Sequence, residues 1–215
     1  MSVSVKICGI NSRAAIDAAV GGGAAFLGFV FYPPSPRHVS AEAAADLARA
    51  VPASIKRVGL FVDADDAALG RAIEAVGLEL LQLHGSETPQ RVFAIKERFG
   101  VPVMKAIRIA AAEDVDEAER YASVTDWLLF DALPPKAMTS ALPGGNALSF
   151  DWRLIAGRQW QKPWMLSGGL TAETLALAIA TSGASVVDVS SGVEDRPGHK
   201  DPVRIAAFLA AAKRL

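Results

Sequence analysis

The sequence is poor in cysteine and histidine, is almost neutral overall, and contains no long hydrophobic run. A single cysteine cannot form an internal disulfide, and its scarcity agrees with a reducing compartment. With 22 basic and 23 acidic residues, the totals show neither the charge of a nucleic-acid-binding protein nor an acidic tail. No stretch approaches the roughly 18 apolar residues of a membrane span, and the first residues lack a signal-peptide pattern. We therefore expect a cytoplasmic protein that binds neither nucleic acid nor a membrane.

The three histidines also argue against a catalytic metal. His38, His84 and His199 show no HxH or HExxH spacing and no paired acidic ligand. The sequence therefore predicts that no metal ion takes part in the chemistry.

Short apolar segments, alternating with amphipathic ones, fill the whole chain. Hydrophobic residues make up 51% of it, and alanine-rich helices on apolar strands are typical of α/β proteins. The intervals leave room for one helix and two short loops each, as parallel βαβ units require. The predicted strands are Val3–Cys8, Phe26–Phe31, Lys56–Phe61, Leu80–Leu83, Val103–Ile107, Trp127–Phe130, Trp164–Ser167 and Val186–Val189.

Eight such units predict a single-domain (β/α)8 barrel over residues 1–215. The main structural alternative is a doubly wound open sheet, which often carries a GxGxxG fingerprint after its first strand, and none follows Cys8 here. The irregular segment Pro134–Ser149 is predicted to be an active-site loop over the barrel mouth. Capping residues, two of them followed by proline, mark the predicted helix starts. They are Ser40 before Ala41–Ala50, Thr88-Pro89, Thr171 before Ala172–Ala180, and Asp201-Pro202.

Cys8 stands at the end of the first predicted strand, the end at which barrels place their chemistry. Residues alternate between the two faces of a strand, so Lys6 and Cys8 share a face. A nearby ammonium favours the thiolate, which is the reactive form of cysteine, so we expect Lys6 to lower the pKa of Cys8. The alternative is that Cys8 is a small buried hydrophobic residue.

Two glycine-bearing turns follow the last two predicted strands. They contain Gly168 and Gly169, and Ser190, Ser191 and Gly192. Backbone N–H groups in such turns bind phosphate oxygens, and barrels commonly place a phosphate site after strands seven and eight. We therefore predict a phosphate site, the alternative being two ordinary helix starts.

Asp131 ends the sixth predicted strand, where a partly desolvated carboxyl can serve as a general acid. Cys8 and Asp131 can face each other across a barrel mouth as base and acid. The alternative is that Asp131 only starts a loop or caps it.

Arg37 lies in a loop stiffened by three prolines, so its guanidinium can be held ready for a bidentate carboxylate contact. The alternative is an ordinary exposed arginine. Gln82 and His84 share one face of the fourth strand, and Asp188 shares a face with Ser190. These three are expected to be wall residues near the mouth without an assigned step, and His84 can equally be a structural histidine.

Seven blocks of the sequence, in order, resemble the phosphoribosylanthranilate isomerase family of tryptophan biosynthesis. They cover nearly the whole chain. The blocks are Lys6–Ile10, Gly28–Tyr32 with Ser35–Arg37, Arg57–Val62, Leu81–Gly85, Phe150–Trp152, Leu166–Leu170, and Val187–Glu194 with Pro197–Asp201.

The resemblance implies a (β/α)8 barrel that performs an Amadori rearrangement without a cofactor. The substrate would be N-(5-phosphoribosyl)anthranilate and the product 1-(2-carboxyphenylamino)-1-deoxyribulose 5-phosphate. By the same resemblance Cys8 would be the general base, Asp131 the general acid, and Arg37 the contact for the anthranilate end. One position departs from the family pattern, since Ala147 replaces a glycine in the loop before Phe150.

Three other functions remain as alternatives. An aminoaldose isomerase of histidine biosynthesis is expected to have an aspartate in place of Cys8, and a pentose-phosphate epimerase is expected to have metal-binding histidines. A catalytically silent phosphate-binding barrel would have no need for both Cys8 and Asp131. We expect a monomer that binds a small phosphosugar, with a homodimer as the alternative.

Overall fold

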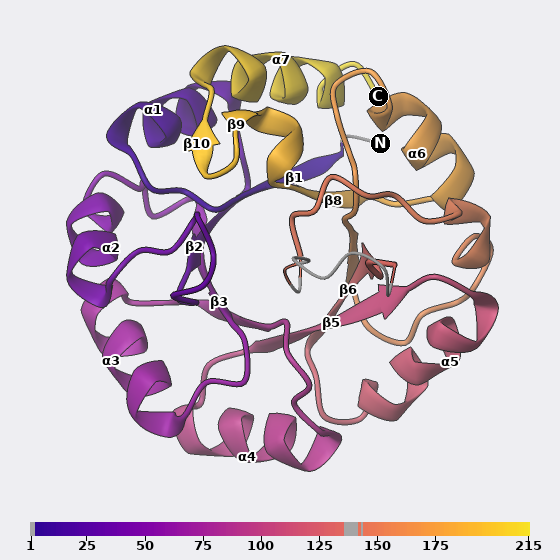
Figure 1. Ribbon diagram of the computed structural model, residues 1–215, viewed down its shortest axis with the longest axis horizontal. Coiled ribbons are helices and arrows are strands. Elements are labelled where there is room, and N and C mark those ends of the chain that lie inside the picture. The colour runs from indigo at the N-terminus through magenta and orange to yellow at the C-terminus, as the bar shows by residue number, and fades with distance from the viewer. Residues whose placement is uncertain (1–2, 136–141, 143) are drawn as a thin grey trace.

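The computed structural model describes residues 3–135, 142 and 144–215, and within them eight parallel strands close into a barrel. Each strand pairs with the next along the chain, and β8 pairs with β1 (Figure 1). The predicted barrel is confirmed, and the open-sheet alternative is wrong because β1 has a neighbour on both sides. The strands are β1 Ser4–Cys8, β2 Phe26–Val30, β3 Lys56–Phe61, β4 Leu80–Leu83, β5 Val103–Ile109, β6 Trp127–Ala132, β7 Trp164–Leu166 and β8 Val186–Val189.

Helices form a ring around the strands when the molecule is viewed down the barrel (Figure 1). No α-helix follows β6 in the described residues, where an irregular segment leads to a short 3-10 helix, Trp152–Leu154. This segment is the predicted loop Pro134–Ser149, of which residues 136–141 and 143 lie outside the described residues. The α-helices are α1 Arg13–Gly22, α2 Ala41–Ala48, α3 Asp66–Val76, α4 Pro89–Phe99, α5 Ala112–Tyr121, α6 Leu175–Ser182 and α7 Pro202–Ala212.

Three of the four helix starts predicted from capping residues are observed. Ser40, Thr88 and Asp201 each accept a hydrogen bond from a backbone N–H in the first turn, as predicted. The start predicted at Thr171 is wrong, because α6 begins at Leu175. Thr171 does accept a bond from the Thr174 N–H, but this bond closes a turn that precedes the helix.

A β-hairpin lies between β8 and α7, above β1 and beside α1 (Figure 1). Its strands are β9 Glu194–Arg196 and β10 His199–Lys200. In the described part of the chain, no helix is long and apolar enough to cross a membrane.

Side chains of alternate strand residues fill two separate hydrophobic regions. The larger lies between the strands and the helices, and the smaller is inside the barrel, away from the mouth. The inner region consists of Phe26, Val58, Leu80, Met104, Ala106, Leu129 and Met165.

An ion pair lies inside the barrel where β1 meets β8. Lys6 is fully buried, and its Nζ lies 2.7 Å from Oδ1 of Asp188, its register partner on β8. Burial lowers the pKa of Lys6, but the charges of Asp188 and Cys8 and their hydrogen bonds with the ammonium together outweigh this, and the pKa is raised overall. Lys6 is therefore a buried cation at neutral pH, and it depends on the anionic groups beside it.

We expect Lys6→Met to lower the free energy of unfolding by about 3–5 kcal/mol, because Asp188 would keep a buried charge without a cation. Replacing both residues, by Lys6→Met with Asp188→Leu, should recover most of the loss because no charge remains. Urea unfolding followed by circular dichroism measures both. A single variant as stable as the wild type would show that this pair does not hold β1 to β8.

Candidate active site

A pocket opens at the C-terminal ends of the barrel strands and encloses about 740 Å³ of empty space, its mouth included. Every residue proposed from the sequence for the site lines this pocket, except Lys6, which lies deeper and is paired with Asp188. The predicted residues on the wall are Cys8, Arg37, Gln82, His84, Asp131, Gly168, Gly169, Asp188, Ser190, Ser191 and Gly192.

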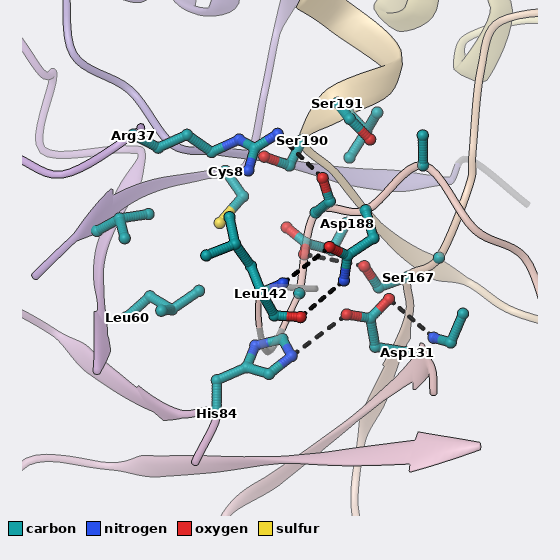
Figure 2. Close-up of a pocket in the computed structure, with 18 of the residues that line it drawn as sticks. Cys8, Arg37, Leu60, His84, Asp131, Leu142, Ser167, Asp188, Ser190 and Ser191 are labelled. Carbon is teal, nitrogen blue, oxygen red and sulfur yellow. Dashed lines mark hydrogen bonds and ion pairs between the residues drawn. The ribbon is translucent and has the colours of Figure 1, made fainter. Parts of the chain in front are cut away.

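Cys8 and Arg37 lie on one side of the pocket, and His84 and Asp131 lie on the other (Figure 2). The two sides belong to β1 with the loop after β2, and to the ends of β4 and β6. The structure thus brings the proposed base and the proposed acid to opposite walls of one cavity.

The thiol of Cys8 is held in a tight, buried place. A side chain on Gly28 of β2 would put its Cβ 3.1 Å from the sulfur and 3.2 Å from Lys6 Nζ, so glycine makes room for both groups. Burial raises the pKa of Cys8, and the charges of Lys6 and Lys200 offset this only in part. The expectation that Lys6 lowers this pKa below its ordinary value is wrong, because the charge of Lys6 is paired with Asp188 and desolvation of the thiolate dominates.

Asp131 belongs to a short polar chain along the pocket wall. Its Oδ1 accepts a hydrogen bond from the Ala132 N–H at 2.9 Å, and its Oδ2 lies 3.2 Å from Nε2 of His84. The other ring nitrogen of His84, Nδ1, lies 3.0 Å from the side-chain amide of Gln82. The orientation of this amide therefore sets which nitrogen of His84 carries the proton.

Gly144, in the loop after β6, lies against the His84–Asp131 pair. A Cβ on this glycine would lie 2.8 Å from Cε1 of His84 and 2.9 Å from Oδ2 of Asp131. The loop backbone therefore covers the carboxyl closely. The sequence identified the loop as a cover for the mouth, but it did not identify this residue as a neighbour of Asp131.

The glycine turns after β7 and β8 meet at the other end of the pocket. Gly168 and Gly169 have φ values of +89° and +63°, the left-handed region that side chains disfavour. The backbone of Leu148 comes so close that a Cβ on Gly169 would lie 2.9 Å from its carbonyl carbon. A Cβ on Gly192 would collide with the carbonyl oxygen of Leu170. These turns present backbone, with little side chain, to the cavity.

Asp188 connects Lys6, buried below the pocket, with Ser167, which lines it. Besides Lys6, it accepts a hydrogen bond from the Ser167 hydroxyl, which lies 3.3 Å from Oδ2. In the close-up, Asp188 lies between Cys8 and Ser167 (Figure 2).

The guanidinium of Arg37 is buried, and its bidentate partner is a residue of the chain itself. Nε and Nη2 donate to Oε1 and Oε2 of Glu194 at 2.8 and 2.9 Å, and Nη2 also donates to the Gly145 carbonyl at 3.1 Å. The prediction that this face of Arg37 is held ready for a ligand carboxylate is therefore corrected, because Glu194 occupies it. Among the residues that the structure describes, the Nη1 edge is the one left for a ligand. Lys200 shares Glu194 with Arg37.

Sequence reasoning assigned no role to Glu194 or Lys200. Both lie in segments that carry the family resemblance, and that was the signal that could have found them. In the described residues, no group of three or more His, Cys, Asp or Glu side chains is placed to hold a metal ion.

Ala147 has a φ of +56°, a left-handed conformation that costs a residue with a Cβ about 1–2 kcal/mol. This is the position where the family pattern has glycine. Ala147, which lines the pocket, thus adopts at a cost a conformation that glycine adopts without strain.

Comparisons with known proteins agree on one family. The family model for N-(5'-phosphoribosyl)anthranilate (PRA) isomerase matches residues 5–211. A curated N-(5'-phosphoribosyl)anthranilate isomerase from Rhodospirillum centenum is 59% identical over the full length of both chains.

Solved structures of the family have the same fold. One, described as monomers of the dimeric phosphoribosylanthranilate isomerase from Thermotoga maritima, is 36% identical, with a TM-score of 0.85 over 99% of this chain and 100% of that one. Another phosphoribosylanthranilate isomerase, with the same identity, coverage and TM-score, is in complex with reduced 1-(o-carboxyphenylamino)-1-deoxyribulose 5-phosphate.

We expect Ala147→Gly to raise the free energy of unfolding by about 1 kcal/mol, because the relief of the left-handed strain outweighs the greater entropy that glycine gives the unfolded chain. The control is Ala206→Gly in the exposed middle of α7, which should lower it by about 1 kcal/mol. Chemical denaturation measures both. Equal losses in the two variants would contradict the strain at residue 147.

Proposed function

Because the chain belongs to the N-(5'-phosphoribosyl)anthranilate isomerase family, we propose that Cys8 is the general base and Asp131 the general acid of its reaction. The enzyme is an isomerase of tryptophan biosynthesis. One observation carries the assignment: Cys8 and Asp131 end two different strands, and their side chains line opposite walls of the same pocket.

The reaction needs one proton delivered and another removed. Asp131 gives its proton to the ring oxygen of the ribose, the bond from that oxygen to C1' breaks, and the nitrogen lone pair forms a protonated Schiff base. The Cys8 thiolate then takes the proton from C2', and the electrons of that bond form the C1'–C2' double bond while the iminium becomes a neutral amine. The enolamine tautomerises to the ketone, so no cofactor is needed.

For this role the carboxyl of Asp131 must hold a proton before the ring opens. The proton is held if Asp131 donates to Nε2 of His84, while Nδ1–H of His84 donates to the oxygen of the Gln82 amide. The 3.2 and 3.0 Å separations support this chain. This direction places the oxygen of the Gln82 amide, in place of its nitrogen, beside Nδ1, and the direction of an amide is assigned from its hydrogen-bond network.

Two anionic ends of the substrate fit the two ends of the pocket. The phosphate is bound by the backbone of the turns at Gly168–Gly169 and Ser190–Gly192, and the anthranilate carboxylate by the Nη1 edge of Arg37. Because both anchors are far from C1' and C2', their binding energy can orient the reacting carbons between base and acid.

All of these residues come from one chain, and we propose that residues 1–215 work as a single catalytic domain, as a monomer in the cytoplasm. The alternative is a homodimer, which is the state named for the Thermotoga maritima relative.

We expect Cys8→Ala to lower kcat by at least ~10²-fold with KM within a few-fold, because the base acts on C2' and on neither anchored end. Asp131→Asn should cost at least ~10²-fold in kcat, because an amide cannot deliver the proton that opens the ring. Steady-state fluorescence assays of anthranilate turnover measure both, with circular dichroism to verify folding. More than a tenth of the wild-type kcat in either folded variant would remove that residue from its role.

The pH dependence should reflect the buried thiol. The productive form of the site holds one proton in total, and kcat/KM falls on the alkaline side when an upper ionisation removes it. Because burial raises the pKa of Cys8, we assign this upper ionisation to the thiol. The fall of kcat/KM on the alkaline side should therefore lie above the ordinary thiol value of about 8.5.

The chain has a single cysteine, so its thiolate can be titrated directly by ultraviolet absorbance, with Cys8→Ser as the blank. The midpoint should coincide with the alkaline limb of kcat/KM. A thiolate already formed at neutral pH would contradict the assignment.

A further inference from the structure

Glu194 is the centre of a buried group of charges beside the pocket, the Glu194 cluster, formed with Arg37 and Lys200. Glu194 binds Arg37 through both carboxylate oxygens, at 2.8 and 2.9 Å, and Oε1 also accepts from Lys200 Nζ at 2.5 Å. All three residues are 3–5% exposed. The segments they come from, the loop after β2 and the β9–β10 hairpin, are far apart in the sequence.

Glu194 decides which edge of Arg37 faces the pocket. The guanidinium is a planar fork, so fixing Nε and Nη2 also fixes the direction of Nη1. Gly145 takes the remaining N–H of Nη2 and approaches Nη1 so closely that a Cβ on this glycine would lie 2.5 Å from it. In the described part of the chain, Nη1 is therefore the edge of Arg37 left for a ligand in the pocket that Arg37 lines, and Glu194 and Gly145 fix its orientation.

Lys200 extends the cluster to the opposite anchor. Besides Glu194, its Nζ donates to the carbonyl and the hydroxyl of Ser190 at 3.0 and 3.2 Å. Ser190 begins the glycine turn after β8, so a single carboxylate connects the arginine to the proposed phosphate end. Gly9, which follows Cys8, adjoins both cations, since its Cβ would lie 2.9 Å from Arg37 Cδ and 3.2 Å from Lys200 Nζ.

The charges of the cluster suit an incoming carboxylate. Burial tends to raise the pKa of Glu194, but the bonds from Arg37 and Lys200 outweigh it and the pKa is lowered, so Glu194 is anionic. Arg37 and Lys200 then share the single negative charge of Glu194, and the substrate carboxylate would balance the remaining positive charge. A buried ion pair adds little to stability when compared with apolar residues of similar volume, so stability alone does not account for these charges.

We propose that Glu194 is a positioning residue that aims the Nη1 edge of Arg37 at the anthranilate carboxylate. Lys200, which bonds both Glu194 and Ser190, holds the carboxylate of Glu194 in a fixed place relative to the phosphate turn. This rests on the proposed contact between Arg37 and the substrate. Glu194 touches no reacting atom, and its effect passes through Arg37. The consequence is selectivity for a carboxylated aromatic amine over the same amine without the carboxylate.

The test compares two substrates, N-(5-phosphoribosyl)anthranilate and N-(5-phosphoribosyl)aniline, which lacks the carboxylate. In the wild type, kcat/KM should favour the anthranilate. Glu194→Gln should reduce kcat/KM for the anthranilate by about 10- to 100-fold, mainly through KM, as expected for a misaligned charge-assisted contact. The aniline substrate should change by less than about threefold, so the preference between them falls.

Arg37→Ala and the double variant separate this proposal from the one it rests on. Arg37→Ala should abolish the preference, and adding Glu194→Gln should reduce it no further. An unchanged preference in Arg37→Ala would overturn the carboxylate contact itself. A lost preference in Arg37→Ala but an unchanged one in Glu194→Gln would overturn only the positioning role.

Glu87→Gln is the matched control, because Glu87 pairs with the buried Lys105 at 2.8 Å in another part of the fold. It should lower stability, as the loss of any buried partner does, without changing the substrate preference. Equal losses for both substrates in Glu194→Gln would show a merely structural carboxylate. If Glu194→Gln does not fold, Glu194→Asp replaces it: its shorter carboxylate should lower the preference, and an unchanged preference would overturn the proposal.

Discussion

The ion pair between Lys6 and Asp188 is the constraint on which the barrel mouth depends. A charge inside the barrel is tolerated only beside its partner, and these two meet only when β1 and β8 are neighbours in the observed register. The same register places Cys8 and Ser190, each two residues further along its strand, at the mouth. The pairing that closes the barrel therefore also places the proposed base beside the proposed phosphate turn.

This pairing also fixes the chemistry of the thiol. An unpaired Lys6 next to Cys8 would favour the thiolate strongly, but Asp188 takes up most of its charge, and burial then raises the pKa of Cys8. The thiol of Cys8 is thus buried, and only a small fraction of it is in the reactive thiolate form. The charge of Lys6 stabilises the closed barrel by pairing with Asp188, and it stabilises the thiolate of Cys8 only to the extent that it is not paired. A more stable barrel therefore means a lower thiolate population.

Local patterns were enough to predict the barrel and the placement of Cys8 and Asp131, because strand periodicity and strand ends are properties of neighbouring residues. They could not predict the partner of Arg37, since Glu194 lies 157 residues away along the chain. They also gave the wrong direction for the pKa of Cys8, which depends on burial and on Asp188 from another strand. The late start of α6 was missed because Thr171 makes a capping-type bond without starting the helix.

The two walls of the pocket are built by different means, and the sequence signals each in a different way. The side with Cys8 and Arg37 is held by buried charges, and Lys6 and Arg37 each have a partner far away in the sequence. The side with Asp131 is enclosed by backbone, with Gly144 against the carboxyl and Leu148 against Gly169. Backbone enclosure needs glycine or left-handed geometry at each close approach, and Ala147 meets that need at φ +56° without being glycine. The loop after β6 therefore tolerates sequence change as long as its backbone path is kept. On the side held by buried charges, a substitution of one member of an ion pair is tolerated only when its partner is replaced as well.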